Sequence, residues 1–129
     1  MSNLPVISVV DDDPSVRVAT ENLLTSLGYI VQTFASAEEF LRSQHLRDTS
    51  CVIADVQMPL MSGVELQALM LARGRSVPFI FITAFPDETV HARVMKAGAT
   101  CLLTKPFDGL ALIKCLDAAL KKPGPGTEE

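Results

Sequence analysis

Five short runs rich in apolar and β-branched residues recur along the chain, and each is followed by a segment with helical spacing of its apolar residues. Continuous apolar runs of this length are typical of strands buried on both faces of a parallel sheet. We therefore predict strands at residues 6–10, 29–34, 51–54, 79–82 and 101–103. Helices are predicted in the intervals, beginning near residues 14, 36, 62, 87 and 108.

Start and stop signals frame the predicted helices. Asp13 is a favourable N-cap before Pro14, and Gly28 ends the segment that follows. Ser36 and Ser62 each precede a glutamate by three positions, which is the pattern of a capping box. Because strands and helices alternate along the chain, we predict an α/β fold with a five-stranded parallel sheet and helices on both faces.

The chain has 129 residues, of which 48% are hydrophobic, and this suits one ordinary domain with its own core. The net charge is −4, so the segment by itself is not expected to bind nucleic acid. No apolar run approaches the ~20 residues that span a bilayer, and the first residues lack the features of a signal peptide. We expect a cytoplasmic domain over residues 1–121, followed by a linker or disordered tail at residues 122–129 that is rich in proline and glycine.

The three cysteines have no spacing that indicates a metal site or a disulfide framework. Cys51 and Cys101 fall in predicted strands, and Cys115 falls in the last predicted helix. We therefore expect buried, apolar thiols in a reducing cytosol, and neither a disulfide nor a zinc site.

Polar side chains stand where the predicted strands end. Asp11 and Asp12 follow the first strand, Asp55 follows the third, Thr83 the fourth and Lys105 the fifth. The carboxyl ends of parallel strands meet at one edge of a sheet, and ligands bind there in open α/β sheets. Carboxylates, a hydroxyl and an amine at one edge can hold a divalent cation and handle a phosphoryl group.

Close carboxylates repel one another, so the convergence of Asp11, Asp12 and Asp55 needs a compensating charge. Mg²⁺ supplies it, because this ion prefers oxygen ligands. The alternative is that residues 11–13 are solvated acids that cap a helix. That alternative suits Asp13 well but does not account for Asp55.

Asp55 is either a metal ligand or a nucleophile that takes a phosphoryl group as an acyl phosphate. Lys105 and Mg²⁺ can neutralise the phosphoryl oxygens, and Thr83 can donate a hydrogen bond to them. The nucleotide-binding patterns G-x-x-x-x-G-K-[ST] and G-x-G-x-x-G are absent from the sequence. A phosphatase of the haloacid dehalogenase type needs a second acid two residues after its nucleophile, and this chain has Gln57 there.

From Val6 to about Leu120 the sequence resembles the receiver domain of bacterial two-component response regulators. Two stretches, Met61-Ser62-Gly63-Val64-Glu65-Leu66 and Lys105-Pro106-Phe107, are most similar to the FixJ-type branch, whose members usually carry a C-terminal helix-turn-helix domain. The resemblance rests on these motifs: Val9-Val10-Asp11-Asp12-Asp13, Asp55-Val56-Gln57-Met58-Pro59, Ser62-Gly63, Thr83-Ala84, Lys96-Ala97-Gly98-Ala99 and Lys105-Pro106-Phe107.

This resemblance implies a flavodoxin-like (βα)5 fold with strand order 2-1-3-4-5. It implies that Asp55 accepts the phosphoryl group, that Thr83 follows this group inward and that Lys105 pairs with it. The bond between Lys105 and Pro106 is expected to be cis. Mg²⁺ is the implied cofactor, with Asp12 and Asp55 as direct ligands.

Two further metal contacts are implied by the resemblance: the Gln57 carbonyl as a third protein ligand, and Asp11 acting mainly through water. The implied function is a phosphorylation-activated signalling switch, which is no enzyme apart from its own Mg²⁺-dependent phosphoryl transfer and dephosphorylation. Its phosphoryl donor is a sensor histidine kinase, and it controls an output domain or partner, with transcription as the expected output.

Other implied partners are a C-terminal DNA-binding domain, if the chain is a fragment, and a second copy bound through the fourth helix, fifth strand and fifth helix. No membrane contact is expected. Two alternatives stay open: a phosphate-independent interaction module with the receiver fold, and a metal-dependent phosphatase for small substrates.

The sequence departs from the family pattern at two positions. Leu102 stands where the family usually has a switch aromatic, and Leu60 replaces a common acid. Gln57 and Phe85 are expected to flank the path of an attacking water. We expect exclusion of water by Phe85 to outweigh orientation of water by Gln57, and therefore slow loss of the phosphoryl group.

Overall fold

The computed structural model describes residues 4–44 and 46–120. The strands form one parallel sheet with the order β2-β1-β3-β4-β5. This confirms the predicted flavodoxin-like α/β fold. The strands are β1 (Val6–Val10), β2 (Ile30–Phe34), β3 (Cys51–Asp55), β4 (Phe79–Thr83) and β5 (Cys101–Thr104).

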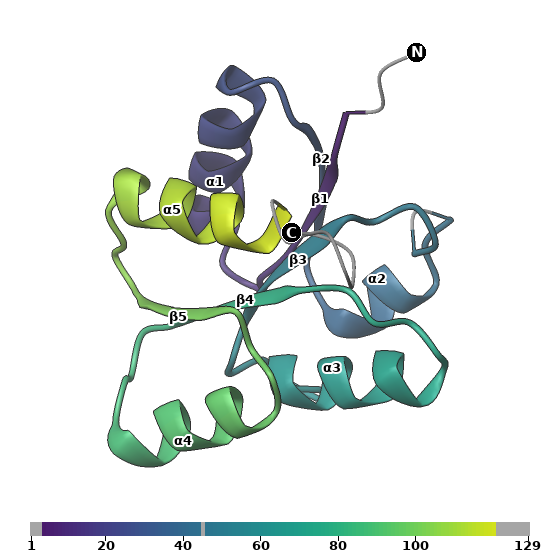
Figure 1. The fold of residues 1–129 in the computed structure, drawn as a ribbon, viewed down its shortest axis with the longest axis vertical. Helices are drawn as coiled ribbons and strands as arrows, with labels where there is room; N and C mark the ends of the chain where they lie inside the picture. The colour runs from purple at the N-terminus through teal and green to yellow at the C-terminus, as the bar shows by residue number, and fades with distance from the viewer. Residues whose placement is uncertain (1–3, 45, 121–129) are drawn as a thin grey trace, which may run out of the picture.

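Helices cover both faces of the sheet. In Figure 1, α1 and α5 lie on one side of the sheet, and α2, α3 and α4 lie on the other. Each helix begins within one residue of its predicted position. The helices are α1 (Pro14–Ser26), α2 (Ala37–Leu41), α3 (Gly63–Ala72), α4 (Glu88–Lys96) and α5 (Gly109–Leu120).

The three central strands are almost entirely buried because both of their faces meet helices. In β3, Val52 and Ala54 join the hydrophobic cluster that also contains residues of α3 and α4. Cys51 and Ile53 point the opposite way, into the cluster that contains residues of α1 and α5. This alternation explains why the central strands read as unbroken apolar runs in the sequence.

Local capping largely follows the sequence signals. Ser62 and Glu65 form the predicted capping box at the start of α3. At the start of α2, the Glu39 backbone N–H donates to Ser36 Oγ at 3.1 Å, as expected. The Glu39 carboxylate, however, accepts from the Ala35 N–H at 2.7 Å, so the second half of that predicted box was wrong.

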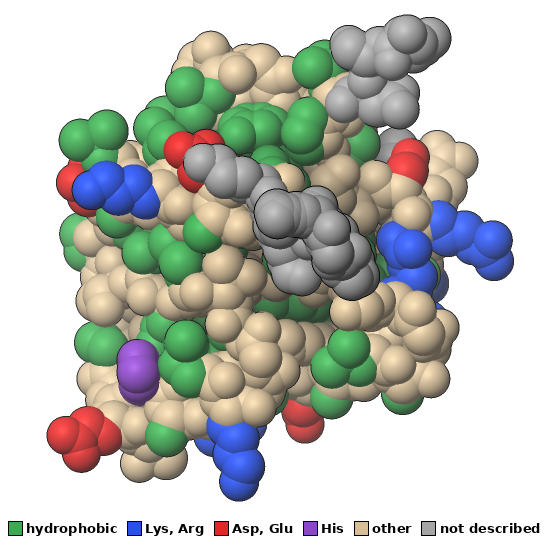
Figure 2. Space-filling model, in the orientation of Figure 1, with side chains coloured by type: hydrophobic (Ala, Val, Ile, Leu, Met, Phe, Trp, Pro, Cys, Tyr) green, Lys and Arg blue, Asp and Glu red, His purple; other side chains and the backbone are tan. Residues whose placement is uncertain are grey.

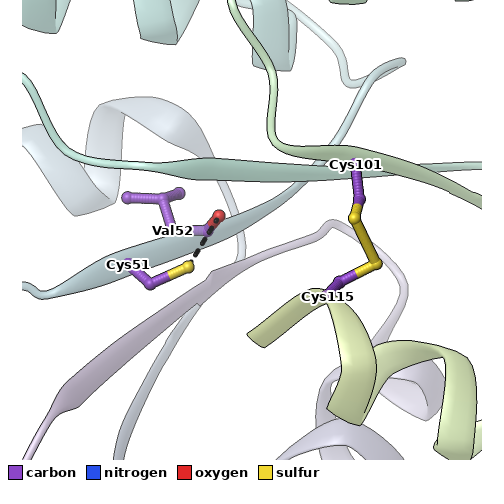
Figure 3. The surroundings of a disulfide bond; sticks show 4 residues. All are labelled: Cys51, Val52, Cys101 and Cys115. Carbon is purple, nitrogen blue, oxygen red and sulfur yellow. Dashed lines mark hydrogen bonds between the residues drawn. A yellow bond between two sulfur atoms is a disulfide. The ribbon is translucent and has the colours of Figure 1, made fainter. Parts of the chain in front are cut away.

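The structure corrects the prediction that all three cysteines are free thiols. Cys101 on β5 and Cys115 on α5 form a disulfide with their Cα atoms 6.1 Å apart (Figure 3). The prediction of free thiols was therefore wrong for this pair, because α5 packs back against β5 and brings together residues 14 positions apart. For Cys51 the prediction of a buried free thiol is confirmed.

Charged side chains of both signs lie mostly around the edge of the face shown in Figure 2, where basic side chains lie next to one another at the right. Among the described residues, no helix is long and apolar enough to cross a membrane. The predicted tail at residues 122–129 lies outside the described residues.

Candidate phosphoryl-acceptor site

The sheet brings the predicted site residues to its carboxyl edge. Asp11 follows β1 directly, and Asp55 and Thr83 are the last residues of β3 and β4. The register pairs Asp55 with Ile82, so Thr83 lies one position beyond it on the neighbouring strand. Lys105 follows β5, and its bond to Pro106 is cis as predicted.

Three carboxylates converge at this edge. Asp11, Asp12 and Asp55 each offer an oxygen, and these oxygens lie within 4.8 Å of one another. Asp11 and Asp55 are buried, whereas Asp12 is exposed. The predicted convergence is confirmed, and the group opens to solvent on the side of Asp12.

Lys105 forms ion pairs with both buried carboxylates. Its Nζ lies 2.9 Å from Asp55 Oδ2 and 3.0 Å from Asp11 Oδ2. This one ammonium balances one of the three carboxylate charges in the group. Arg17 donates to the backbone oxygen of Asp11, at 2.7 Å, and not to its carboxylate. The site therefore keeps an excess of negative charge that a divalent cation can neutralise.

The pKa shifts of Asp11 and Lys105 are consistent with this excess of negative charge. Burial raises the pKa of the Asp11 carboxyl, and the Asp55 charge raises it further, against the lowering effect of the Asp13 N–H and of Lys105. Burial lowers the pKa of Lys105, but the hydrogen bonds and charges of Asp55 and Asp11 outweigh it, so this pKa lies above its ordinary value. Lys105 is thus held as a cation against the carboxylates.

Backbone groups fix the orientation of the buried carboxylates. The Gln57 N–H donates to Asp55 Oδ1 at 3.0 Å, and the Asp13 N–H donates to Asp11 Oδ1 at 2.9 Å. Asp11 Oδ2 accepts no hydrogen bond from the described residues and has only its ion pair with Lys105. An oxygen that is buried and short of donors is suited to a cation.

Gly63 supports Asp55 from behind, a role that the sequence analysis missed. A Cβ at this position would overlap the backbone oxygen of Asp55 and press on the ring of Phe81. Only glycine therefore lets the first turn of α3 approach the end of β3 so closely. The available signal was a glycine directly after the Ser62 N-cap, but the contact itself depends on the tertiary fold.

Thr83 is fully buried, and its hydroxyl has two partners. It accepts from the Phe85 backbone N–H at 3.1 Å and donates to Gln57 Oε1 at 3.4 Å. The Gln57 side chain thus reaches across to β4. The predicted role of the Gln57 carbonyl as a metal ligand stays a prediction.

The family model for the response regulator receiver domain matches residues 7–117. The chain belongs to this family. It is 39% identical over 116 residues to the response regulator protein TodT of Pseudomonas putida, which covers 90% of this chain and 51% of that protein. It is 40% identical over 118 residues to the transcriptional regulatory protein FixJ of Azorhizobium caulinodans, which covers 92% of this chain and 56% of that protein.

A solved structure has the same architecture. The crystal structure of FixJ-N superposes with a TM-score of 0.83 at 31% identity, covering 97% of this chain and 99% of that one. This receiver domain spans about half the length of the curated relatives it matches. It is a regulatory domain, and the family acts as a phosphorylation-activated signalling switch.

Two residues of the receiver domain's loops are unusual. Leu60 in the β3–α3 loop has a positive φ of 71° and is 91% exposed. Phe85 in the β4–α4 loop is 71% exposed, so its ring does not cover Asp55. The expectation that Phe85 excludes water from the site therefore has no support in this conformation, and slow loss of the phosphoryl group stays a prediction.

Proposed function

We propose that this receiver domain lies in the cytoplasm and takes a phosphoryl group from a sensor histidine kinase onto Asp55. The observation that carries the proposal is the placement of the Asp55 carboxylate, which ends a buried strand 2.9 Å from Lys105 Nζ and shares its surroundings with Asp11 and Asp12. A carboxylate oxygen attacks phosphorus, and the bond from phosphorus to the donor nitrogen breaks as the new oxygen–phosphorus bond forms.

The described residues also fit Mg²⁺ as the cofactor. Asp12 and Asp55 are the proposed direct ligands, together with the Gln57 carbonyl, and Asp11 acts mainly through water. When bound, the ion neutralises charge on the oxygens of the transferred group. The excess negative charge of the three carboxylates over the one Lys105 ammonium supports this assignment.

The remaining side chains stabilise the product. Lys105 is already a cation at the acceptor and can pair with a phosphoryl oxygen without a large movement. The Thr83 hydroxyl can exchange its weak contact with Gln57, at 3.4 Å, for a charge-assisted hydrogen bond to the phosphoryl group. These interactions exist only in the phosphorylated state, so they shift the population towards an active arrangement.

The test is phosphorylation by acetyl phosphate and Mg²⁺, read by intact mass. The wild type should gain one phosphoryl group, and Asp55→Asn should gain none. Asp117→Asn is the matched control, because it removes an exposed carboxylate on α5 and should leave uptake unchanged. Uptake by Asp55→Asn equal to that of the wild type would show that the acceptor lies elsewhere.

A metal titration tests the proposed ligands separately. Asp12→Ala should weaken Mg²⁺ binding more than Asp11→Ala, because Asp12 is the proposed direct ligand and Asp11 the water-mediated one. Removal of either acid should also relieve repulsion in the metal-free protein. Equal losses of Mg²⁺ affinity would contradict the distinction.

The phosphate-independent interaction module is the second candidate, and Leu102 favours it because the family's usual switch aromatic is missing. The same mass experiment separates the candidates. A stable adduct supports the switch, the absence of an adduct supports the module, and steady release of phosphate supports a phosphatase.

The proposed output is transcriptional. The relatives include proteins named as transcriptional regulators, and this chain covers about half of their length. We therefore propose a C-terminal DNA-binding domain in the full protein, controlled by the receiver domain.

Phosphorylation is proposed to favour a dimer through α4, β5 and α5. Helix α4 begins with acidic side chains, Asp87 and Glu88, and ends with basic ones, Arg93 and Lys96. An antiparallel two-fold contact would pair these opposite charges. Val94 is fully buried and cannot contribute, which leaves exposed residues such as Met95. Light scattering that finds a monomer with and without phosphate would count against this contact.

A further inference from the structure

An open groove lies between α4 and β5, close to the acceptor site. It has a volume of about 370 Å³ and is lined by Pro86, Asp87, Glu88, His91, Leu102 and Thr104. Leu102 contributes apolar surface to it, since it packs against the hydrophobic cluster on the α4 side of the sheet. Thr104 pairs in register with Thr83, so the groove reaches the strand end that carries the Thr83 hydroxyl.

A large aromatic side chain stands next to this groove without using it. Phe85 is 71% exposed, and the next residue along the chain, Pro86, lines the groove. An aromatic ring in water beside an open, partly apolar groove has a favourable place to move to, because burial of apolar surface stabilises the protein. A restraint on the Phe85 backbone would keep the ring out of this groove.

The hydrogen bond from Phe85 to Thr83 provides this restraint. The Phe85 N–H donates to Thr83 Oγ1 at 3.1 Å, and this hydroxyl also contacts Gln57. The same oxygen is the group that, under the proposed function, turns towards a phosphoryl group on Asp55. The conformation of the β4–α4 loop is thus tied directly to the atom that responds to phosphorylation.

We propose that Phe85 is the residue that couples the acceptor site to the α4–β5 surface. Phosphorylation of Asp55 draws the Thr83 hydroxyl away, the Phe85 N–H loses its acceptor, and the ring moves into the groove against Leu102. This inference rests on the proposed function. It assigns Phe85 as a positioning residue that changes the shape of the α4–β5 face and does not touch the reacting atoms.

The test uses Phe85→Trp, because the sequence contains no tryptophan and the new residue is the sole probe. Acetyl phosphate with Mg²⁺ should shift its emission to shorter wavelength. Quenching by acrylamide should fall at least about twofold, because the probe leaves solvent as the population shifts. Leu71→Trp is the matched control, since Leu71 is 50% exposed on α3, outside the proposed dimer face, and its emission should not change.

Two further variants locate the movement. Asp55→Asn combined with Phe85→Trp should remove the shift, because the acceptor is gone. Leu102→Phe combined with Phe85→Trp should also remove it, because the larger side chain occupies the groove, while uptake of phosphate measured by intact mass continues.

The outcomes separate the inference from the proposed function. Phosphate uptake by Phe85→Trp without any change in emission or quenching would overturn the inference and leave the acceptor assignment intact. A change seen only at concentrations where light scattering detects dimers would also overturn it, since a second copy would then cover the ring. A wild type that takes up no phosphate would instead refute the proposed function, and the inference with it.

Discussion

Leu60 adopts a backbone conformation that leucine rarely takes, with a φ of 71° and a side chain that is 91% exposed. The side chain contributes little packing, whereas its Cβ makes the left-handed region unfavourable. We expect Leu60→Gly to raise the free energy of unfolding by about 1 kcal/mol, measured by urea denaturation. Leu60→Ala keeps the Cβ and is the matched control. If Leu60→Ala raised the free energy of unfolding as much as Leu60→Gly, backbone strain would not be the cause.

Cys51 provides a pH-dependent contribution to stability. Burial raises the pKa of its thiol from 9.0 to about 12. The unfolded chain therefore loses this proton at lower pH than the folded chain does, so the stabilisation is complete below pH 9.0 and is lost as the pH rises towards about 12.

The expected result is that the difference in unfolding free energy between the wild type and Cys51→Ala shrinks as the pH rises through this window. Urea denaturation of both proteins at several alkaline pH values checks it, and the comparison cancels the other groups that titrate there. A difference that stays constant with pH would show that the thiol ionises equally in both states.

At the scale of single residues, the sequence predicted the positions of the side chains that stand at the ends of strands. Asp11, Asp55 and Lys105 converge because parallel strands end at a common edge. The role of Gly63 and the exposure of Phe85 were not predicted, because each depends on how a loop or a helix packs in three dimensions.

The start of α3 lies directly against the end of β3, where Gly63 approaches the backbone of Asp55. Gly63→Ala should lower the free energy of unfolding by roughly 1–3 kcal/mol, because the added methyl group meets the Asp55 backbone and must displace it. Gly109→Ala at the start of α5 is the matched control, since its added Cβ would make only ordinary contacts with Leu23. Urea denaturation measures both variants. Equal losses of unfolding free energy in the two variants would show that the close approach of Gly63 to Asp55 does not cause the loss.

Elements were predictable wherever periodicity and end signals agreed. The Ser62 capping box and the Asp13 N-cap appear as the sequence indicated. The second half of the Ser36 box was wrong because the Glu39 carboxylate found the Ala35 N–H instead. Such a choice between two nearby backbone donors depends on the local chain path, which sequence spacing does not specify.

The topology of the whole molecule followed from the alternation of strands and helices together with the family motifs, whereas the disulfide between Cys101 and Cys115 did not. The two sulfurs meet because α5 returns across β5, and the spacing of the cysteines carries no sign of this. The boundary predicted after residue 121 stays a prediction.

Loss of the disulfide should destabilise the whole domain. For a closed loop of this length, the constraint on the unfolded chain is worth about 3 kcal/mol. A double variant, Cys101→Ala with Cys115→Ala, should therefore unfold at a lower urea concentration than the oxidised wild type. A reductant should lower the midpoint of the wild type and leave that of the double variant unchanged. If the reductant left the wild-type urea midpoint unchanged, the disulfide would not contribute to stability.

The disulfide also divides the α4–β5–α5 surface, the proposed dimer face, into a part held by a covalent link and a part without one. The covalent ring runs from β5 through Lys105 to α5 and is anchored in the hydrophobic cluster on one side of the sheet (Figures 1 and 3). Among the described residues, the β4–α4 loop has no covalent link of this kind. In the oxidised protein β5 and α5 can move only as a linked pair. Under the proposed function, a displacement that starts at Asp55 therefore changes this face by moving α4 relative to that pair.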